Sequence, residues 1–144
     1  MAAHLSLQRE AATLRTIEIV ATPSGAPEVF VSGKLLDIAI SITHSGDTAA
    51  CALSGSGTAL GCDIEQIEPR SNSFLEDYFT VEEQSLLRRS NPTDQWRLAA
   101  LLWSAKESTL KALRVGLRLD TRCVRVTLEP QETQRFKERE WSPL

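Results

Sequence analysis

Two carboxylates stand close together in an otherwise apolar stretch of this chain. Asp63 and Glu65 are two residues apart within residues 59–67, whose composition predicts a strand. Residues two apart in a strand project from the same face, so these acids would lie side by side. Like charges this close repel each other unless a cation or basic side chains compensate them. The pair indicates a cation site, and an edge strand with two solvated acids is the alternative from this segment alone.

A second group of charged residues interrupts a strongly apolar helix predicted over residues 95–113. Lys106, Glu107 and Lys111 follow Trp103, and positions 103, 107 and 111 are four apart, which puts them on one helical face. A Glu-to-Lys pair on the helix surface would explain Glu107 and Lys111 without any function. It does not explain why an indole shares their face, although an amphipathic boundary would. We take Trp103 to be mainly a packing residue.

A single histidine follows a predicted strand over residues 38–43, in which isoleucines alternate with small residues. His44 then opens a Ser- and Gly-containing stretch, residues 44–47, that is typical of a loop. Such a loop can bind an anion, although a lone histidine at a strand end is more often structural.

The remaining elements needed to position these residues are short. We expect a helix over residues 5–16, a hairpin of strands 16–21 and 28–32, and a further strand over 49–53. A short helix is predicted over 74–79, and Thr80 with Glu83 forms a capping-box pattern for a helix ending near Arg89. Asn91 and Pro92 end that helix, Thr93 or Asp94 caps the long one, and Gly116 stops it. A last strand is predicted over 122–128. The fold class is therefore α+β, a small antiparallel sheet packed against a long helix.

Composition narrows the class of protein. The chain has 144 residues, 42% of them apolar and 24% charged, as in one ordinary globular domain. It contains no run near the roughly 20 apolar residues that a membrane span needs, and its first ten residues do not resemble a secretory signal. A net charge of −3 gives no reason to expect nucleic acid. Cys51, Cys62 and Cys123 form no CxxC pair, so we expect buried free thiols and a cytoplasmic protein.

Three motifs in order resemble one enzyme family, the 4′-phosphopantetheinyl transferase superfamily. The chain has Ile-Thr-His-Ser-Gly at residues 42–46, Gly-Cys-Asp-Ile-Glu at 61–65 and Trp-Ser-Ala-Lys-Glu-Ser-Thr-Leu-Lys at 103–111. The last motif looks most like the surfactin-synthetase type, whereas the N-terminal hairpin and the chain length look like the smaller holo-acyl-carrier-protein synthase type. Thr43 stands where the family usually has serine, and threonine also carries a hydroxyl. We expect residues 1–130 to form the transferase domain and residues 131–144 a polar tail.

The resemblance implies a reaction and roles for the site residues. The reaction would move 4′-phosphopantetheine from coenzyme A to a serine of an apo carrier protein and release adenosine 3′,5′-bisphosphate. The metal ligands would be Asp63, Glu65 and Glu107, which suit Mg²⁺ and also Mn²⁺. The catalytic residues would be Glu107, Lys106 and Asp63. The residues binding coenzyme A would be His44, Thr43, Lys106 and Lys111. Glu107 is the candidate for accepting the serine proton, directly or through a metal-bound water.

The length of the chain conflicts with the surfactin-synthetase type, which has two similar lobes with coenzyme A between them. One motif set in 144 residues predicts a homo-oligomer, a trimer above all, or a domain of a larger synthase. Two other functions stay open: a noncatalytic module that binds coenzyme A or a nucleotide, and a magnesium-dependent phosphohydrolase that uses water as nucleophile.

Overall fold

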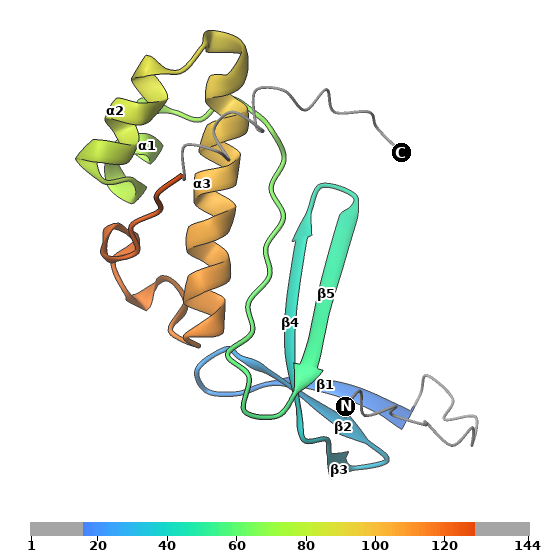
Figure 1. Ribbon diagram of the computed structural model, residues 1–144. Coiled ribbons are helices and arrows are strands. Elements are labelled where there is room, and N and C mark those ends of the chain that lie inside the picture. The colour runs from blue at the N-terminus through green and yellow to red at the C-terminus, as the bar shows by residue number, and fades with distance from the viewer. Residues whose placement is uncertain (1–15, 129–144) are drawn as a thin grey trace, which may run out of the picture.

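The computed structural model describes residues 16–128, and these form an α+β fold, as expected (Figure 1). The helix expected over residues 5–16 and the polar tail over 131–144 lie outside the described residues, apart from Thr16. Two small antiparallel sheets replace the single sheet that we expected. A helical unit occupies one side of the molecule and the sheets the other, with an extended segment running between them (Figure 1).

The first sheet consists of three strands, β1 (Ile17–Ala21), β2 (Pro27–Val31) and β3 (Lys34–Leu35), paired in that order. The β1–β2 hairpin confirms the predicted one, with Ile17 opposite Val31 and Ala21 opposite Pro27. The two-residue strand β3 has no hydrophobic alternation, so the sequence did not predict it.

The second sheet is a long hairpin of β4 (Ile38–Ser45) and β5 (Thr48–Gly55). Its register pairs Ser45 with Thr48, so only Gly46 and Asp47 remain for the turn. The loop predicted over residues 44–47 is confirmed at Gly46 and Asp47 and was wrong at residues 44 and 45, because a two-residue turn lets the strand continue through His44 to Ser45. Gly46 has a φ of 54°, which glycine adopts without the steric cost that other residues incur.

The strand predicted over residues 59–67 was also wrong. This part of the chain belongs to an extended stretch over residues 58–71 without ladder pairing, which we call the acidic segment. It passes between β4 and the long helix (Figure 1). Its backbone amides therefore bond to side chains of β4 instead of a neighbouring strand. The long helix consequently lies against the acidic segment, with the hairpin beyond it.

Three helices form the other side of the molecule: α1 (Asn72–Tyr78), α2 (Val81–Arg89) and α3 (Pro92–Ala112). The predicted capping box at α2 is confirmed, since the Glu83 amide donates to Thr80 Oγ1 and the Thr80 amide donates to Glu83 Oε2. Asn91 is the N-cap of α3 and Pro92 its first residue, so the cap predicted at residue 93 or 94 was wrong. Proline suits this position because its missing N–H would have no helical partner there.

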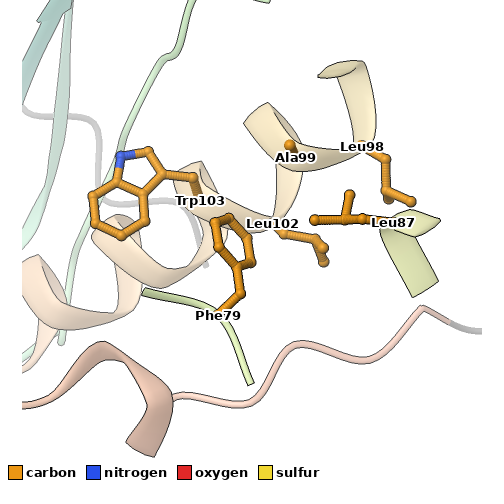
Figure 2. Packing of buried hydrophobic residues seen from close by; sticks show 6 residues of the cluster. All are labelled: Phe79, Leu87, Leu98, Ala99, Leu102 and Trp103. Atoms are coloured by element: carbon orange, nitrogen blue, oxygen red, sulfur yellow. The ribbon is translucent and has the colours of Figure 1, made fainter. Parts of the chain in front are cut away.

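The hydrophobic core lies where α2 and α3 meet, around Phe79, Leu87, Leu102 and Trp103 (Figure 2). The indole of Trp103 contacts the rings of Phe74 and Tyr78 edge-on, with centroids 5.1 and 5.0 Å away. Trp103 thus packs in the core, as we expected, although the sequence placed it on the helix face of Glu107 and Lys111.

After α3 the described chain contains two single-turn 3₁₀ helices, Gly116–Arg118 and Thr121–Cys123. The strand predicted over residues 122–128 was wrong: the chain beyond Val124 is extended but pairs with no other described strand. Its amide at Val126 donates instead to the Glu83 carboxylate, 2.9 Å away. None of the described helices is both long and apolar enough to span a membrane. The cysteines are free, but Cys51 and Cys123 are exposed, contrary to the expected burial.

Candidate functional site

A row of hydroxyls on β4 holds the acidic segment in place. The amides of Cys62, Ile64 and Gln66 point toward Ser41 Oγ, Thr43 Oγ1 and Ser45 Oγ, at 2.9, 3.4 and 3.1 Å. Side chains in β4 and in the extended acidic segment alternate between two faces. Every second residue of β4 therefore meets every second residue of the acidic segment. We call these three side chains the hydroxyl ladder. It satisfies backbone groups that a β-ladder would otherwise satisfy.

The other side of the acidic segment rests directly on α3. A Cβ atom added to Gly61 would overlap the carbonyl oxygen of Ser108 and stand 2.7 Å from the amide nitrogen of Ala112. Glycine is therefore required at this position by the close approach of two backbones. One turn earlier along α3, Ser104 Oγ donates to the carbonyl of Asp63 over 2.9 Å. These contacts fix the acidic segment along the helix face that carries Glu107 and Lys111.

Asp63 lies at the centre of this arrangement with only 4% of its side chain exposed. Its Oδ1 accepts hydrogen bonds from Thr43 Oγ1 at 2.8 Å and from Lys111 Nζ at 2.6 Å. Lys111 also donates to the carbonyl of Cys62. The other oxygen, Oδ2, is buried and has no hydrogen-bond partner among the described residues. A buried carboxylate oxygen without a partner is costly unless a cation or donor reaches it.

Glu65 forms an ion pair with an arginine of the same acidic segment. Arg70 Nη2 lies 2.7 Å from Glu65 Oε2, and Arg70 also pairs with Glu68 and covers the Phe74 ring. Burial and repulsion from Asp63 raise the pKa of Glu65, while Arg70 and a hydrogen bond from Trp103 lower it in part. The net direction is upward, with burial as the largest cause and repulsion from Asp63 as the second.

Glu107 is the third acid of the group and the least compensated. Lys111 forms its ion pair with Asp63, so the surface Glu107–Lys111 pair that we considered as an alternative is not formed. Burial raises the pKa of Glu107, and repulsion from Asp63 and Glu65 adds to the increase despite the attraction of Lys111. The mutual repulsion shows that the three carboxylates form one electrostatic cluster.

The side chains of Asp63, Glu65 and Glu107 are of the chemical type that binds a divalent cation. The cluster offers carboxylate oxygens, which hard cations prefer, and includes one buried oxygen without a partner. Within residues 16–128, however, no three acidic, histidine or cysteine side chains already converge closely enough to hold a metal ion. Glu65 is turned toward Arg70, which accounts for part of this. Asp63 and Glu107 would therefore be the first residues to hold a cation, with Glu65 joining them.

Lys106 is not brought to this cluster. Its side chain is 0% exposed, and Nζ contacts Glu83 Oε2 at 2.9 Å together with the carbonyls of Thr121 and Val124. An ammonium group has three N–H donors, and these three acceptors use all of them. In this structure Lys106 therefore joins α3 to the start of α2 and to the chain beyond α3, and it has no donor left for a phosphate.

His44 and Thr43 point to opposite faces of β4, because successive side chains of a strand alternate. Thr43 is buried against the acidic segment, whereas His44 is exposed on the outer face of the β4–β5 hairpin. The structure thus brings Asp63, Glu65, Glu107, Lys111 and Thr43 together and leaves His44 and Lys106 outside.

A cavity of about 270 Å³ adjoins the cluster on the side of Lys111. It lies between the β1–β2 turn, the first half of β4 and the C-terminal end of α3, and its walls include Ser41, Leu60, Lys111 and Arg114. Polar and apolar groups share these walls, as in sites for ligands with both kinds of surface.

Sequence reasoning missed the support that Ser41, Ser45 and Arg70 give to the acidic segment, and it assigned Thr43 to coenzyme A instead of to Asp63. Ser41, Thr43 and Ser45 alternate with larger residues, a visible pattern that indicates one hydroxyl-bearing strand face. Arg70 follows Glu65 by five residues, a spacing that predicts no contact in an extended chain. In the structure the Arg70 guanidinium nevertheless donates to the Glu65 carboxylate at 2.7 Å.

Comparisons with known proteins lead to a single family. A family model described as the 4′-phosphopantetheinyl transferase superfamily matches residues 59–143. The chain is 38% identical over 72 residues to the 4′-phosphopantetheinyl transferase AcpT of Salmonella typhimurium, covering 49% of this chain and 37% of the relative. It is 34% identical over 85 residues to a 4′-phosphopantetheinyl transferase of Bacillus subtilis, covering 59% and 37%. A third relative, 4′-phosphopantetheinyl transferase gsp of Aneurinibacillus migulanus, is 27% identical over 108 residues, covering 75% and 45%. The chain thus spans less than half the length of each of these relatives.

Proposed function

Because this chain belongs to the 4′-phosphopantetheinyl transferase superfamily, we propose that it transfers 4′-phosphopantetheine from coenzyme A to a carrier protein. The serine hydroxyl of an apo acyl or peptidyl carrier protein attacks the phosphorus that bears the pantetheine arm. The bond to the bridging diphosphate oxygen breaks, and adenosine 3′,5′-bisphosphate leaves. The observation that carries this proposal is the buried, partnerless Oδ2 of Asp63 within a cluster of three repelling carboxylates.

The carboxylate cluster supports a dependence on Mg²⁺, with Mn²⁺ as a substitute. Asp63, Glu107 and Glu65 would hold the ion, which supplies charge neutralisation and alignment of the diphosphate. Lys111 has one N–H left after bonding Asp63 and Cys62, and we assign that donor to a phosphate oxygen. Glu107 is first a metal ligand and second the acceptor of the serine proton, since ligation lowers the basicity of a carboxylate.

We place the two ends of coenzyme A on different parts of the molecule. The cavity beside Lys111 has the mixed polarity that suits the pantetheine arm, which carries amide groups along an aliphatic chain. By resemblance, His44 contacts the 3′-phosphate, and its exposed position on the outer face of the hairpin leaves it accessible. The motif suggested that Lys106 binds phosphate. We leave it out of this proposal because its side chain is buried and paired with Glu83.

The outer face of the β4–β5 hairpin supports self-association. Ile42 and Leu53 are 40% and 64% exposed there, next to the exposed Cys51. A second copy of the chain, most simply in a cyclic trimer, would cover this apolar face and complete the wall around His44. The alternative is that the chain is a domain of a larger synthase. Sedimentation velocity distinguishes them, because a strict monomer that is active with coenzyme A would contradict the trimer.

Mass spectrometry of an apo carrier protein tests the function directly. Incubation with this protein, coenzyme A and Mg²⁺ should add the mass of one phosphopantetheine arm to the carrier. Asp63→Ala and Glu107→Ala should abolish the addition while circular dichroism shows a folded protein. Near-normal activity of either variant would show that the metal assignment is wrong. We place the protein in the cytoplasm, where its free cysteines and coenzyme A are compatible with reducing conditions.

A noncatalytic module that binds coenzyme A or a nucleotide is the second candidate, because no three acidic, histidine or cysteine side chains of residues 16–128 already lie close enough together to hold a metal ion. It predicts binding of coenzyme A without any mass gain on several carrier proteins. Release of adenosine 3′,5′-bisphosphate without a carrier protein would favour a phosphohydrolase instead.

A further inference from the structure

We propose that Thr43 is a positioning residue that orients the Asp63 carboxylate so that Oδ2, and not Oδ1, is offered to the cation. This inference rests on the proposed metal dependence. It gives Thr43 a role that differs from the contact with coenzyme A suggested by its motif. Thr43 is only 5% exposed, and its hydroxyl already has two protein partners.

The two partners of this hydroxyl are neighbours in the chain. Oγ1 accepts from the amide of Ile64 at 3.4 Å and donates to Asp63 Oδ1 at 2.8 Å. A hydroxyl has one proton, so accepting from the amide directs that proton to the carboxylate. The contact therefore connects the Asp63 side chain to the backbone immediately after it.

Lys111 holds the same oxygen from the helix side, with Nζ 2.6 Å from Oδ1. The terminal torsion of an aspartate is soft, and rotation about it exchanges the two oxygens. Two donors on Oδ1, one from β4 and one from α3, oppose that rotation. Oδ2 is left as the buried oxygen without a hydrogen-bond partner among the described residues.

The Thr43 hydroxyl makes a contact with a carboxylate that the other two hydroxyls of the ladder do not make. Ser41 and Ser45 bond to backbone amides of the acidic segment, whereas Thr43 alone among them also bonds to a carboxylate. Removing Ser41 Oγ weakens the support of the segment, whereas removing Thr43 Oγ1 also frees the carboxylate to rotate. Partners that orient metal ligands typically change metal affinity about 10- to 100-fold.

The test measures Mn²⁺ binding by the full chain, using electron paramagnetic resonance to count free Mn²⁺. Thr43→Val keeps the side-chain shape and removes the hydroxyl, and Thr43→Ser keeps the hydroxyl. We expect Thr43→Val to weaken Mn²⁺ binding about tenfold and Thr43→Ser to stay within about threefold of the parent. Ser41→Ala is the matched control, with a lower melting temperature but Mn²⁺ affinity within about threefold of the parent.

The outcomes separate this inference from the proposed function. Equal Mn²⁺ affinity of Thr43→Val and Thr43→Ser would overturn the positioning role and leave the metal site standing. Failure of the parent protein to bind Mn²⁺ would overturn both. If Thr43→Val does not fold, Thr43→Ala and Thr43→Ser form the second pair, since they differ by one oxygen atom. An equal loss in Ser41→Ala and Thr43→Val would also refute the role, because it would show a general effect of the hydroxyl ladder.

Discussion

Replacing Lys106 by methionine tests whether this lysine stabilises the fold or binds phosphate. Methionine keeps most of the side-chain length and removes the ammonium group. The structure surrounds that group with Glu83 Oε2 at 2.9 Å and two backbone carbonyls, with no exposed surface. We therefore expect the variant to lose stability and the folded fraction to keep its affinity for coenzyme A.

The magnitude follows from what the substitution leaves behind. Glu83 is 2% exposed and would be left with two amide donors but without its cationic partner. Breaking a buried ion pair in this way costs about 3–5 kcal/mol, a large part of the roughly 5–15 kcal/mol that stabilises a domain. At about 3 °C per kcal/mol for this size, the melting temperature should fall by about 10–15 °C.

A double-mutant cycle measures the pair itself. Glu83→Gln removes the partner charge and retains an acceptor for the Thr80 amide. The double variant should be less destabilised than the sum of the single variants by about 2 kcal/mol, because neither charge is then left alone. Thermal denaturation followed by circular dichroism gives these values, and Lys34→Met is the matched control at an exposed lysine.

Two results would refute this reasoning. A Lys106→Met variant within about 1 kcal/mol of the parent would show that the buried pair does not stabilise the fold. Normal melting combined with a large loss of affinity for coenzyme A, measured by calorimetry, would show that Lys106 reaches the substrate after all.

Three further predictions concern the site and its support. Glu107→Gln should raise the melting temperature of the metal-free protein at neutral pH. Burial and the neighbouring acids raise the pKa of Glu107 above its ordinary 4.5, so the folded state favours the protonated carboxyl. The stability that the protonated carboxyl contributes is lost as the pH rises through the folded pKa. The advantage of the variant should disappear below about pH 4.5, and melting curves from about pH 4 to 8 that run parallel would contradict this. Gly61→Ala should lower the free energy of unfolding by about 1–3 kcal/mol and abolish transfer, because its Cβ meets the backbone of α3. Gly55→Ala is the control, since a Cβ there meets open space, and it should cost less. Equal melting temperatures of the two variants would disprove the close approach. Trp103→Ala should cost about 3–5 kcal/mol in urea denaturation and Trp103→Phe distinctly less, and a cost below 1 kcal/mol would show that the aromatic cluster is not part of the core.

The helices and the first hairpin were predictable because their signals are local. The capping box at Thr80 and Glu83, the apolar run of α3 and the hairpin around residues 22–26 all act within a few positions of the chain. Residues 59–67 and 122–128 were mistaken for strands, since strand propensity does not reveal whether a partner strand exists. Hydroxyls and a carboxylate took the place of that partner.

The sequence by itself indicated the family, which the family model confirms, and it predicted the residues of the proposed site. The order and spacing of the three motifs single out Asp63, Glu65, Glu107 and Lys111 as candidates, because residue type and periodicity are properties of the chain alone. The tertiary structure alone decided which neighbours these groups have. Lys106 and Glu107 are adjacent in sequence, yet the helix turns one into the core and the other toward the acids. Thr43 and His44 are separated in the same way by the alternation of β4. Hydrogen bonds and burial act over a few ångströms in space, so the partners of each side chain become known only when distant segments are brought together.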